Sequence, residues 1–329
     1  MHTLNWGILS TAKIGVKKVI PAMQHGEKCT IRAIASRDEK RARAAAEQLG
    51  IPRAYGSYDE LLTDKDIHAI YNPLPNHLHV SWTIKALHAG KHVLCEKPIA
   101  LSADEAAELT ENAKMYPDLK VMEAFMYRFH PQWIKAKELV KAGEIGVLQT
   151  IQTFFSYNNV NPDDIRNIAE YGGGGLMDIG CYPISVARFL FDTEPIDVFG
   201  HMDFDPTFET DILTSAVLKF ENGRATFTVS TQVEPYQRVL IFGTEGQIEI
   251  DIPFNAPPNK PTRLWLNKKS HTEEIEFDIC DQYQLQGDAF SQAVINDEPV
   301  PTPLDDAVAN MRVIDAVIKS HSAGMWIKP

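Results

Sequence analysis

Short apolar runs alternate with amphipathic stretches along the first part of the chain. Continuously apolar strands that alternate with helices form parallel sheets covered on both faces. Two serines, Ser57 and Ser102, each stand three residues before a glutamate, and this capping-box spacing predicts two helix starts. We therefore predict an α/β fold that begins with a Rossmann-like, doubly wound parallel sheet over residues 1–123. The predicted strands are Asn5–Leu9, Ile31–Ala35, Ala69–Tyr71, His92–Leu94 and Lys120–Met122, and the predicted helices are Ile14–Met23, Glu39–Leu49, Leu78–Ala89 and Ala103–Lys114.

The pattern changes after a helix-like segment that ends near Gly143. Runs of alternating apolar and polar residues follow, and turn signals such as Glu221–Arg224 and Gly243–Gly246 separate several of them, as in an antiparallel sheet. We predict a C-terminal α+β domain over residues 124–329, built on a large, mostly antiparallel open sheet. The predicted strands are Gln149–Phe155, Ser215–Phe220, Ala225–Thr231, Arg238–Phe242, Gln247–Ile252, Arg263–Leu266 and Glu273–Phe277, and the predicted helices are Ile179–Phe191, Gln286–Asn296 and Asp305–His321.

Composition and charge narrow the classes of function. The 329 residues suffice for two domains, and 32 basic against 44 acidic side chains give a net charge of −12. An acidic protein repels nucleic acid and anionic membranes at long range, so neither is an expected partner. No stretch approaches the roughly 20 apolar residues of a membrane span, and the N-terminus lacks the pattern of a signal peptide. We expect a soluble, cytoplasmic protein.

Cysteine and histidine spacing predicts no metal site. The four cysteines lie far apart and form no Cys-x-x-Cys pair, so they indicate neither a zinc site nor a disulfide framework. His88 and His92 have the spacing of two ligands on one helix face. Gly90 between them is expected to end the helix before His92 starts a strand, which separates the two imidazoles.

The first predicted strand runs into a turn of small residues and then a helix. Ser10, Ala12 and Gly15 occupy the three positions that are glycines in the dinucleotide fingerprint, where the pyrophosphate sits on a helix N-terminus. Serine and alanine are small enough to keep this turn tight. The alternative is an ordinary βα turn without a cofactor, and the motif alone leaves both readings open.

The end of the second predicted strand bears on the choice between NAD and NADP. An NAD site usually has a carboxylate there for the ribose 2′-hydroxyl, whereas NADP needs a cation for the 2′-phosphate. This chain has Ser36 and Arg37 at the tip, with Arg41 one helical turn later, so we favour NADP. In the alternative reading both arginines are solvated and Asp38 only caps a helix.

Two further strand ends carry polar side chains. Ligands of doubly wound sheets bind beyond the carboxyl ends of strands, so the loop that contains Asn76 and His79 is expected to face the cofactor. Asn76 could instead be a helix N-cap. Lys97 follows the next strand, where a lysine can donate to a carbonyl oxygen. A surface ion pair between Lys97 and Glu96 is the alternative.

Several segments together resemble the Gfo/Idh/MocA family of oxidoreductases. They are the turn Ser10–Gly15 and the segments Glu96–Pro98, Glu123–Pro131, Gly172–Tyr182 and Asn310–Ala316, in the order of the family. The chain is similar to the branch with glucose–fructose oxidoreductase, dimeric dihydrodiol dehydrogenase and NADP-dependent D-xylose dehydrogenase, many relatives having histidine in place of Tyr182. Ser10 and Ala12 depart from the glycines of the family.

The resemblance implies roles for individual residues. Lys97 and Tyr182 correspond to the catalytic pair, and Asp178 to a carboxylate that lines the substrate site. A phenol has a reference pKa of about 10, and a nearby cation lowers it, so Tyr182 beside Lys97 could exchange a proton with the substrate oxygen. Asp178 could share a helix face with Tyr182 and also cap that helix. The cofactor residues are expected to be Ser10, Thr11, Ala12, Lys13, Ile14, Ser36, Arg37, Arg41, Leu74, Asn76, His79, Glu96, Lys97, Arg166 and Tyr283.

The expected function is hydride transfer between NADP and a hydroxyl or carbonyl carbon of a sugar-like substrate. Arg128 and His130 could line the substrate pocket or hold the domain junction. The family also implies a homodimer or homotetramer formed through the C-terminal sheet. Other readings are a keto-sugar reductase for nucleotide-linked sugars, a dihydrodiol-type dehydrogenase, and a catalytically silent NADP-binding sensor.

Overall fold

The computed structural model describes residues 2–269 and 271–329. The chain forms two compact units. The first unit contains the residues up to Met126 together with Asp281–Val308, and the second contains Tyr127–Cys280 and Ala309–Pro329. The first boundary lies close to the expected one, but Asp281–Val308 was expected in the second domain and belongs to the first unit. In this segment the predicted domain limits differ from the limits of the two units.

The first unit is built on a parallel sheet of six strands in the order β3-β2-β1-β4-β5-β6. Every pair of neighbours is parallel, which confirms the doubly wound sheet. The predicted strands are present, and β3 is an addition whose three residues are all half-exposed, so they give no apolar run. The strands are β1 (Leu4–Leu9), β2 (Cys29–Ala35), β3 (Arg53–Tyr55), β4 (Ala69–Asn72), β5 (His92–Cys95) and β6 (Val121–Glu123).

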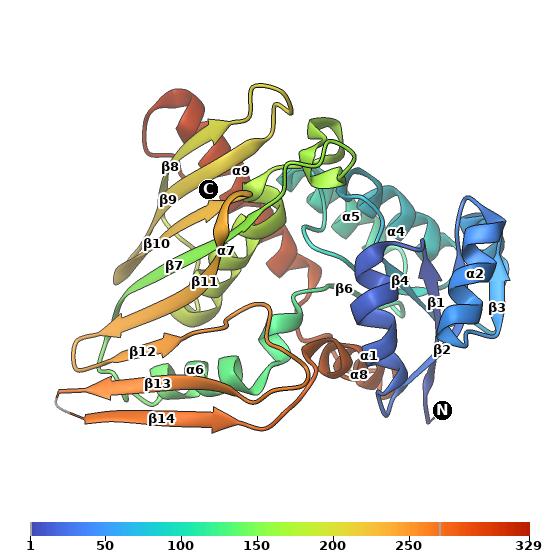
Figure 1. Ribbon diagram of the computed structural model, residues 1–329, viewed down its shortest axis with the longest axis horizontal. Coiled ribbons are helices and arrows are strands. Elements are labelled where there is room, and N and C mark those ends of the chain that lie inside the picture. Colours follow the sequence, from blue (N-terminus) through green and yellow to red (C-terminus); the bar gives the residue numbers. More distant parts are fainter. Residues whose placement is uncertain (1, 270) are drawn as a thin grey trace. The chain divides into compact units, whose positions relative to one another are not determined.

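Helices cover the small sheet, and their ends follow local sequence signals (Figure 1). Ser57, Ser102 and Asp38 each accept a backbone N–H at a helix start, as a capping residue should. Helix α8 packs on β1 and β2, and α1 packs on β2 and α8, whereas α4 packs on β4, β5 and α5. The helical segments are η1 (Gly15–Val19, a π-helix), α1 (Ile20–Gln24), α2 (Glu39–Leu49), α3 (Tyr58–Thr63), η2 (Asn76–Leu78), α4 (His79–His88), α5 (Ala103–Lys114), η3 (Met126–Phe129) and α8 (Gln282–Ile295).

The second unit contains an eight-stranded sheet in the order β14-β13-β12-β11-β7-β10-β9-β8. The neighbours are antiparallel except for β7 and β10, which run parallel. The mostly antiparallel sheet is therefore confirmed, although β8 was not predicted. The strands are β7 (Leu148–Asn158), β8 (Asp197–Phe204), β9 (Asp211–Phe220), β10 (Gly223–Ser230), β11 (Gln232–Gly243), β12 (Gln247–Ile250), β13 (Thr262–Lys268) and β14 (His271–Phe277).

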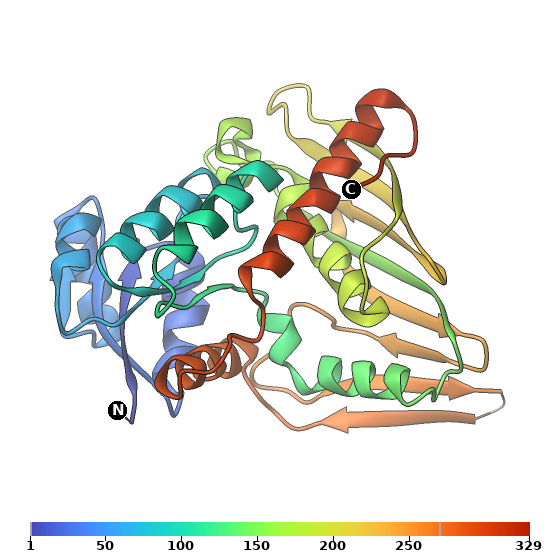
Figure 2. The ribbon, with the colours of Figure 1, turned by 180° about the vertical axis from the view of Figure 1, so that it is seen from behind.

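Helices lie on one face of the large sheet, and no helix of residues 2–269 or 271–329 covers the other face, which we call the bare face (Figures 1 and 2). A Cβ atom on Gly200 of β8 would be 2.7 Å from Val317 of α9, so this helix lies directly on the strand. Helix α7 begins at Cys181, whereas the predicted start was Ile179, and α9 begins at Leu304, next to the predicted Asp305. The helical segments are α6 (Pro131–Lys141), η4 (Ile165–Asn167), η5 (Ala169–Tyr171), η6 (Leu176–Gly180, a π-helix), α7 (Cys181–Phe191) and α9 (Leu304–Ala323), which starts in the first unit.

Candidate active site

The turn after β1 fits the phosphates of a dinucleotide. Ser10 has a φ of +84°, in the left-handed region where the fingerprint has glycine. Its N–H donates to Ala35 O at 2.9 Å, which fixes the turn against β2. Within the described chain, the backbone N–H groups of Thr11, Ala12 and Lys13 donate to no protein acceptor. Such orphan donors at a helix start are suited to phosphate oxygens. Cofactor contact by these residues and Ile14 stays a prediction.

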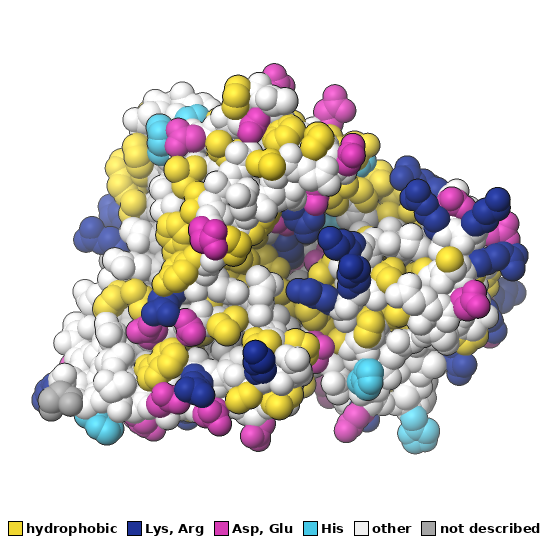
Figure 3. Space-filling model, viewed as in Figure 1, with side chains coloured by type: hydrophobic (Ala, Val, Ile, Leu, Met, Phe, Trp, Pro, Cys, Tyr) yellow, Lys and Arg dark blue, Asp and Glu magenta, His cyan; other side chains and the backbone are white. Residues whose placement is uncertain are grey.

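The tip of β2 presents cations to solvent. Arg37 and Arg41 are exposed, and Arg41 Nε lies 3.7 Å from Asp38 Oδ2. Ser36 is buried, and its Oγ accepts from Asp38 N at 3.2 Å. Asp38 also caps α2, as the alternative reading expected. Figure 3 shows Lys and Arg side chains gathered around α1 and α2, which supplies positive potential in an otherwise acidic chain.

His79 holds two loops of the first unit together. The side chain is fully buried, with Nδ1 2.7 Å from Pro98 O and Nε2 2.7 Å from Leu74 O. Burial lowers the pKa of His79 to about 4, whereas the two carbonyl oxygens act in the opposite direction, because only the protonated ring can donate to both of them. Its direct contact with a cofactor is untested, and the geometry gives it a positioning role for the Leu74 loop and the segment after Lys97. Asn76 is not the expected N-cap, because Pro75 precedes η2 and Leu78 precedes α4.

The carboxyl ends of β5 and β6 carry the chemistry-bearing groups of the first unit. Lys97 is half-buried directly after β5. Glu96 accepts a hydrogen bond from Tyr71 Oη at 2.6 Å. Tyr283 on α8 also lies near the Glu96 carboxylate. Burial, and to a lesser extent the negative charge of Glu96, raise the pKa of the Tyr283 phenol. Buried Glu123 at the end of β6 accepts from Ile99 N at 2.8 Å and so fixes the backbone that follows Lys97.

The glycine run before α7 allows a close approach to β9. A Cβ atom on Gly174, whose φ is +107°, would lie 2.1 Å from Asp211 Oδ1. Asp211 Oδ2 accepts from Leu176 N at 2.8 Å and from Thr214 Oγ1 at 2.6 Å. Asp211 is therefore the carboxylate at the start of this helical segment. The expected cap, Asp178, instead lies inside η6, so its predicted capping role is wrong.

Two side chains of the second unit donate hydrogen bonds to Asp178. Tyr157 Oη donates to its Oδ2 at 2.7 Å, and Arg166 Nε donates to the same oxygen at 2.9 Å. The Asp178 side chain is 15% exposed and that of Arg166 is 39% exposed. Arg166 was expected to contact the cofactor, a contact that stays untested, whereas its ion pair with Asp178 is a feature of the fold.

Tyr182 lies one helical turn after Asp178, on α7. Its ring is 5% exposed and packs against Tyr127, Phe155 and Phe254, with ring centroids 5.0–5.9 Å apart. These aromatic contacts fix the ring plane and so restrict where the hydroxyl can point. Lys97 belongs to the first unit, whereas Asp178 and Tyr182 share the second.

The two residues proposed for the substrate pocket are anchored inside the second unit. Arg128 Nη2 donates to Ser185 Oγ at 2.7 Å. His130 is buried, and its Nδ1 accepts from Gln132 N at 3.2 Å as the cap of α6. Burial lowers the pKa of His130 to about 4. Both contacts are consistent with the structural alternative, and pocket contacts by either residue remain a prediction.

Sequence reasoning missed three residues of this arrangement. Tyr71 lies within the buried strand β4, where the sequence gives no sign of its hydrogen bond to Glu96. Tyr157 and Asp211 lie on strands that are far in sequence from the helical segment they contact. The available signal was the glycine run itself, which marks a place where another chain segment comes close.

The residues that the structure describes contain no helix long and apolar enough to cross a membrane. They also contain no cluster of three or more His, Cys, Asp or Glu side chains able to hold a metal ion.

Two models of protein families match the chain. The oxidoreductase family with an NAD-binding Rossmann fold matches residues 4–124. The GFO/IDH/MocA C-terminal domain matches residues 133–249. The first match includes Lys97, and the second includes Asp178 and Tyr182.

Known proteins are similar over nearly their whole length. An uncharacterized oxidoreductase of Rhizobium meliloti is 46% identical, over 99% of this chain and 99% of the relative. The NADP-dependent D-xylose 1-dehydrogenase 2 of Haloferax volcanii is 41% identical, over 98% of this chain and 99% of the relative. A crystal structure of a 3-ketoreductase from Actinomadura kijaniata with NADP and TDP-benzene has a TM-score of 0.91 and 28% identity, covering 97% of this chain and 98% of that one.

Variants of that ketoreductase have also been solved. One has a tyrosine replaced by phenylalanine and another a lysine replaced by alanine, with TM-scores of 0.90 and 0.87 and 28% and 27% identity. Each covers 97% of this chain and 98% of the other. Taken with both family matches, the fold and the full-length relatives, this shows that the chain is an oxidoreductase of the Gfo/Idh/MocA family with an NAD(P)-binding Rossmann domain.

Proposed function

We propose that this enzyme is an NADP-dependent sugar dehydrogenase of the aldose type, with Lys97 and Tyr182 as its proton-handling pair. The observation that carries the proposal is 41% identity over 98% of the chain to an NADP-dependent D-xylose dehydrogenase. The orphan N–H groups after Ser10 and the exposed Arg37 and Arg41 fit a phosphorylated dinucleotide.

Each side chain has a separate task in the proposed reaction. The nicotinamide, when bound, supplies the hydride chemistry, and the protein supplies placement and proton transfer. On oxidation, Tyr182 in its phenolate form takes the proton of the sugar hydroxyl, and on reduction the Tyr182 phenol gives its proton to the carbonyl oxygen. The Lys97 ammonium stabilises negative charge on the same oxygen. A lysine and a tyrosine are also the residues exchanged in the solved variants of the ketoreductase.

Replacing Tyr182 by phenylalanine tests the assignment. Tyr182→Phe keeps the ring and its packing but removes the transferable proton, so kcat should fall by about 10²–10⁴-fold. NADPH binding, followed by its fluorescence, should stay within about twofold of wild type, because the phosphate turn lies in the other unit. Tyr116→Phe, at a half-buried position just after α5, is the matched control and should leave kcat unchanged.

Turnover is measured as absorbance of the reduced nicotinamide, with NADP and NAD, across aldoses, inositols and dihydrodiols. Aldose turnover that prefers NADP supports the proposal, and an unchanged kcat in Tyr182→Phe would contradict it. NADP that raises the melting temperature while no substrate reacts would instead favour the silent sensor. Nucleotide-linked keto sugars belong in the same panel because the ketoreductase with TM-score 0.91 was solved with a TDP compound. Turnover of these sugars alone would favour the keto-sugar alternative.

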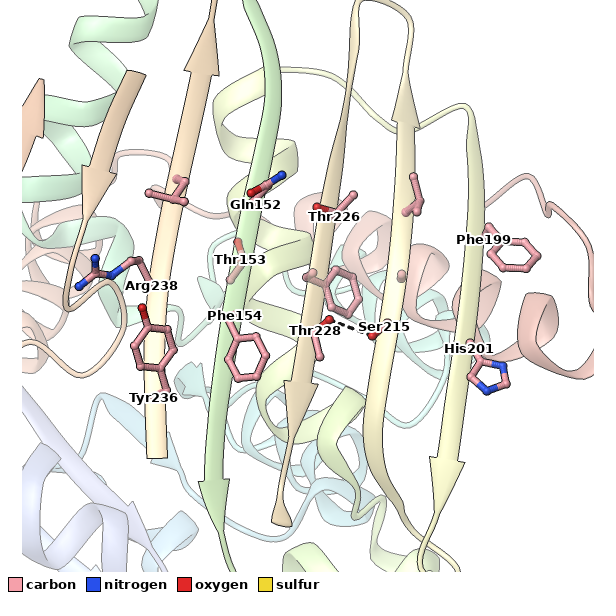
Figure 4. A pocket seen from close by; sticks show the side chains of 14 residues that line it. Gln152, Thr153, Phe154, Phe199, His201, Ser215, Thr226, Thr228, Tyr236 and Arg238 are labelled. Atoms are coloured by element: carbon pink, nitrogen blue, oxygen red, sulfur yellow. Dashed lines mark hydrogen bonds between the residues drawn. The ribbon is translucent and has the colours of Figure 1, made fainter. Parts of the chain in front are cut away.

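We also propose that the bare face of the large sheet binds a second copy of this chain. A pocket of about 550 Å³ opens on this face, lined by aromatic and short hydroxyl side chains (Figure 4). The Ser215–Thr228 hydrogen bond of 2.8 Å lies near its centre. Arg238 at its border is already paired with Glu249 and Asp251. Two copies that each carry −12 repel one another, so a contact is most favourable through a face with little net charge.

A further inference from the structure

Two donors from different elements reach the same oxygen of Asp178. Tyr157 comes from the end of β7, and Arg166 from η4 in the loop before the glycine run. An ionised carboxylate only accepts hydrogen bonds, and Arg166 remains charged at any pH of interest. A phenol and a guanidinium on one oxygen therefore favour the anion and fix the orientation of its plane. The ion pair also affects Arg166, because the negative charge of Asp178 raises the pKa of its guanidinium.

The titratable groups around Asp178 within its own unit are few. Tyr157 lies on β7, Arg166 and Asp164 lie in and beside η4, and Tyr182 lies one turn later on the same helical segment. Asp211 approaches the start of the segment from β9, and burial raises its pKa. Arg166 is a cation of this group, and its loss would remove a positive charge that favours ionised Asp178.

The position of Asp178 relative to Tyr182 suggests what this anion binds. Asp178 lies in the π-helix η6 and Tyr182 four residues later in the first turn of α7, so the two are about one helical turn apart. If Tyr182 handles the proton at the reacting oxygen, Asp178 can reach a hydroxyl on the neighbouring carbon of the same substrate. A carboxylate held ionised is a good acceptor for such a hydroxyl and cannot serve as a proton donor.

We propose that Tyr157 and Arg166 are positioning residues that hold Asp178 as an oriented anion, which accepts a hydrogen bond from the substrate hydroxyl next to the reacting carbon. The proposal rests on the proposed sugar dehydrogenase activity and narrows its substrates to those with a vicinal hydroxyl. A substrate that lacks this hydroxyl cannot form the hydrogen bond to Asp178.

Paired substrates separate this role from a general structural one. We compare an aldose with its 2-deoxy counterpart in wild type, Arg166→Gln, Tyr157→Phe and the control Arg263→Gln. Arg263 makes exposed ion pairs with Glu274 and Glu276 in the same unit, 3.1 and 3.3 Å long. A hydrogen bond to a charged group contributes about 1.5–3 kcal/mol, or about 10- to 100-fold. For the aldose, kcat/KM should fall by about that factor in Arg166→Gln and by less in Tyr157→Phe.

The deoxy sugar should react at a similar rate in all four proteins, because it has no hydroxyl for Asp178 to bind. Equal losses for both sugars in Arg166→Gln would overturn the proposal, since damage to the fold does not discriminate between them. Arg263→Gln should match wild type with both sugars.

The ionisation of Asp178 can be measured without turnover. Loss of the neighbouring cation should raise the pKa of this carboxyl by about 1–3 pH units. The titration is followed by NMR of protein with ¹³C-labelled aspartate carboxyls, with Asp178→Asn to assign the signal. In the kinetics, the acid limb of kcat/KM for the aldose should move to higher pH in Arg166→Gln and stay in place in Arg263→Gln.

The NMR titration separates this inference from the proposed function. If no sugar is oxidised but the Asp178 signal titrates at higher pH in Arg166→Gln, the sugar dehydrogenase assignment fails and the positioning role is supported. If that signal titrates identically in wild type and Arg166→Gln, the positioning role fails whatever the substrate proves to be.

Discussion

Ser10 combines a proposed binding role with backbone strain. The left-handed region costs an L-residue about 1–2 kcal/mol relative to glycine, and this serine adopts a φ of +84°. Its N–H bond to Ala35 O and the tight exit from β1 impose the conformation. Strained backbone that the surrounding structure maintains is common where a chain approaches a ligand.

Glycine substitutions usually destabilise a folded protein, but replacing Ser10 by glycine should stabilise this one. Ser10→Gly relieves the strain but adds roughly 0.5–1 kcal/mol of chain entropy to the unfolded state, so the free energy of unfolding should rise by about 0.5–1 kcal/mol. Ser10→Val should lower it by about 1–3 kcal/mol, because a β-branched residue fits positive φ poorly. Urea denaturation of both variants measures the difference. A glycine variant less stable than wild type would show that the serine hydroxyl contributes more than the strain costs.

The helical segment η6–α7 depends on a residue that lies far from it in sequence. Helix starts leave backbone N–H groups unpaired, and no side chain of the segment itself caps this one. Asp211 on β9 accepts Leu176 N instead, and the glycines at 174 and 175 leave room for its carboxylate. The strand therefore sets where the segment begins, and hence where Asp178 and Tyr182 lie.

Removal of this carboxylate should destabilise the protein strongly. Asp211→Ala leaves Leu176 N and Thr214 Oγ1 buried without their acceptor, and each unsatisfied group costs about 1–3 kcal/mol. We expect a loss of about 2–5 kcal/mol in the free energy of unfolding. Asp305→Ala, at an exposed site in the first turn of α9, should change it by less than about 0.5 kcal/mol. Thermal or urea unfolding tests both variants, and similar values for the two would contradict the proposed role of Asp211.

The bare sheet face leads to a prediction about the whole molecule. Thr226→Arg places a charge among the residues that line this face, so a complex formed through the face should dissociate. Thr272→Arg, an exposed position on β14, adds the same charge away from that region and should leave the assembly intact. Sedimentation velocity gives the mass of each species. A monomeric wild type, or an unchanged Thr226→Arg assembly, would show that the face does not bind a second copy.

Much of the fold could be predicted from local patterns. Continuous apolar runs located the main parallel strands, and Ser57 and Ser102 marked helix starts because a capping side chain acts on N–H groups within a few residues. The half-exposed β3 and the strand β8 were missed because neither gives a clear pattern of its own. The motifs also led to Lys97, Asp178 and Tyr182, although their roles in a reaction remain proposals.

The amino-acid sequence by itself determined the periodicities, the helix caps, the small residues of the phosphate turn and the family of the chain. Only the tertiary structure decided that α8 belongs to the first unit and that Arg166 pairs with Asp178. It also decided that Asp211 on β9 accepts a backbone N–H at the start of η6. The physical reason is the distance along the chain over which each kind of interaction acts. Periodicity and capping act between residues a few positions apart, whereas burial and ion pairing join residues whose separation along the chain leaves no local pattern.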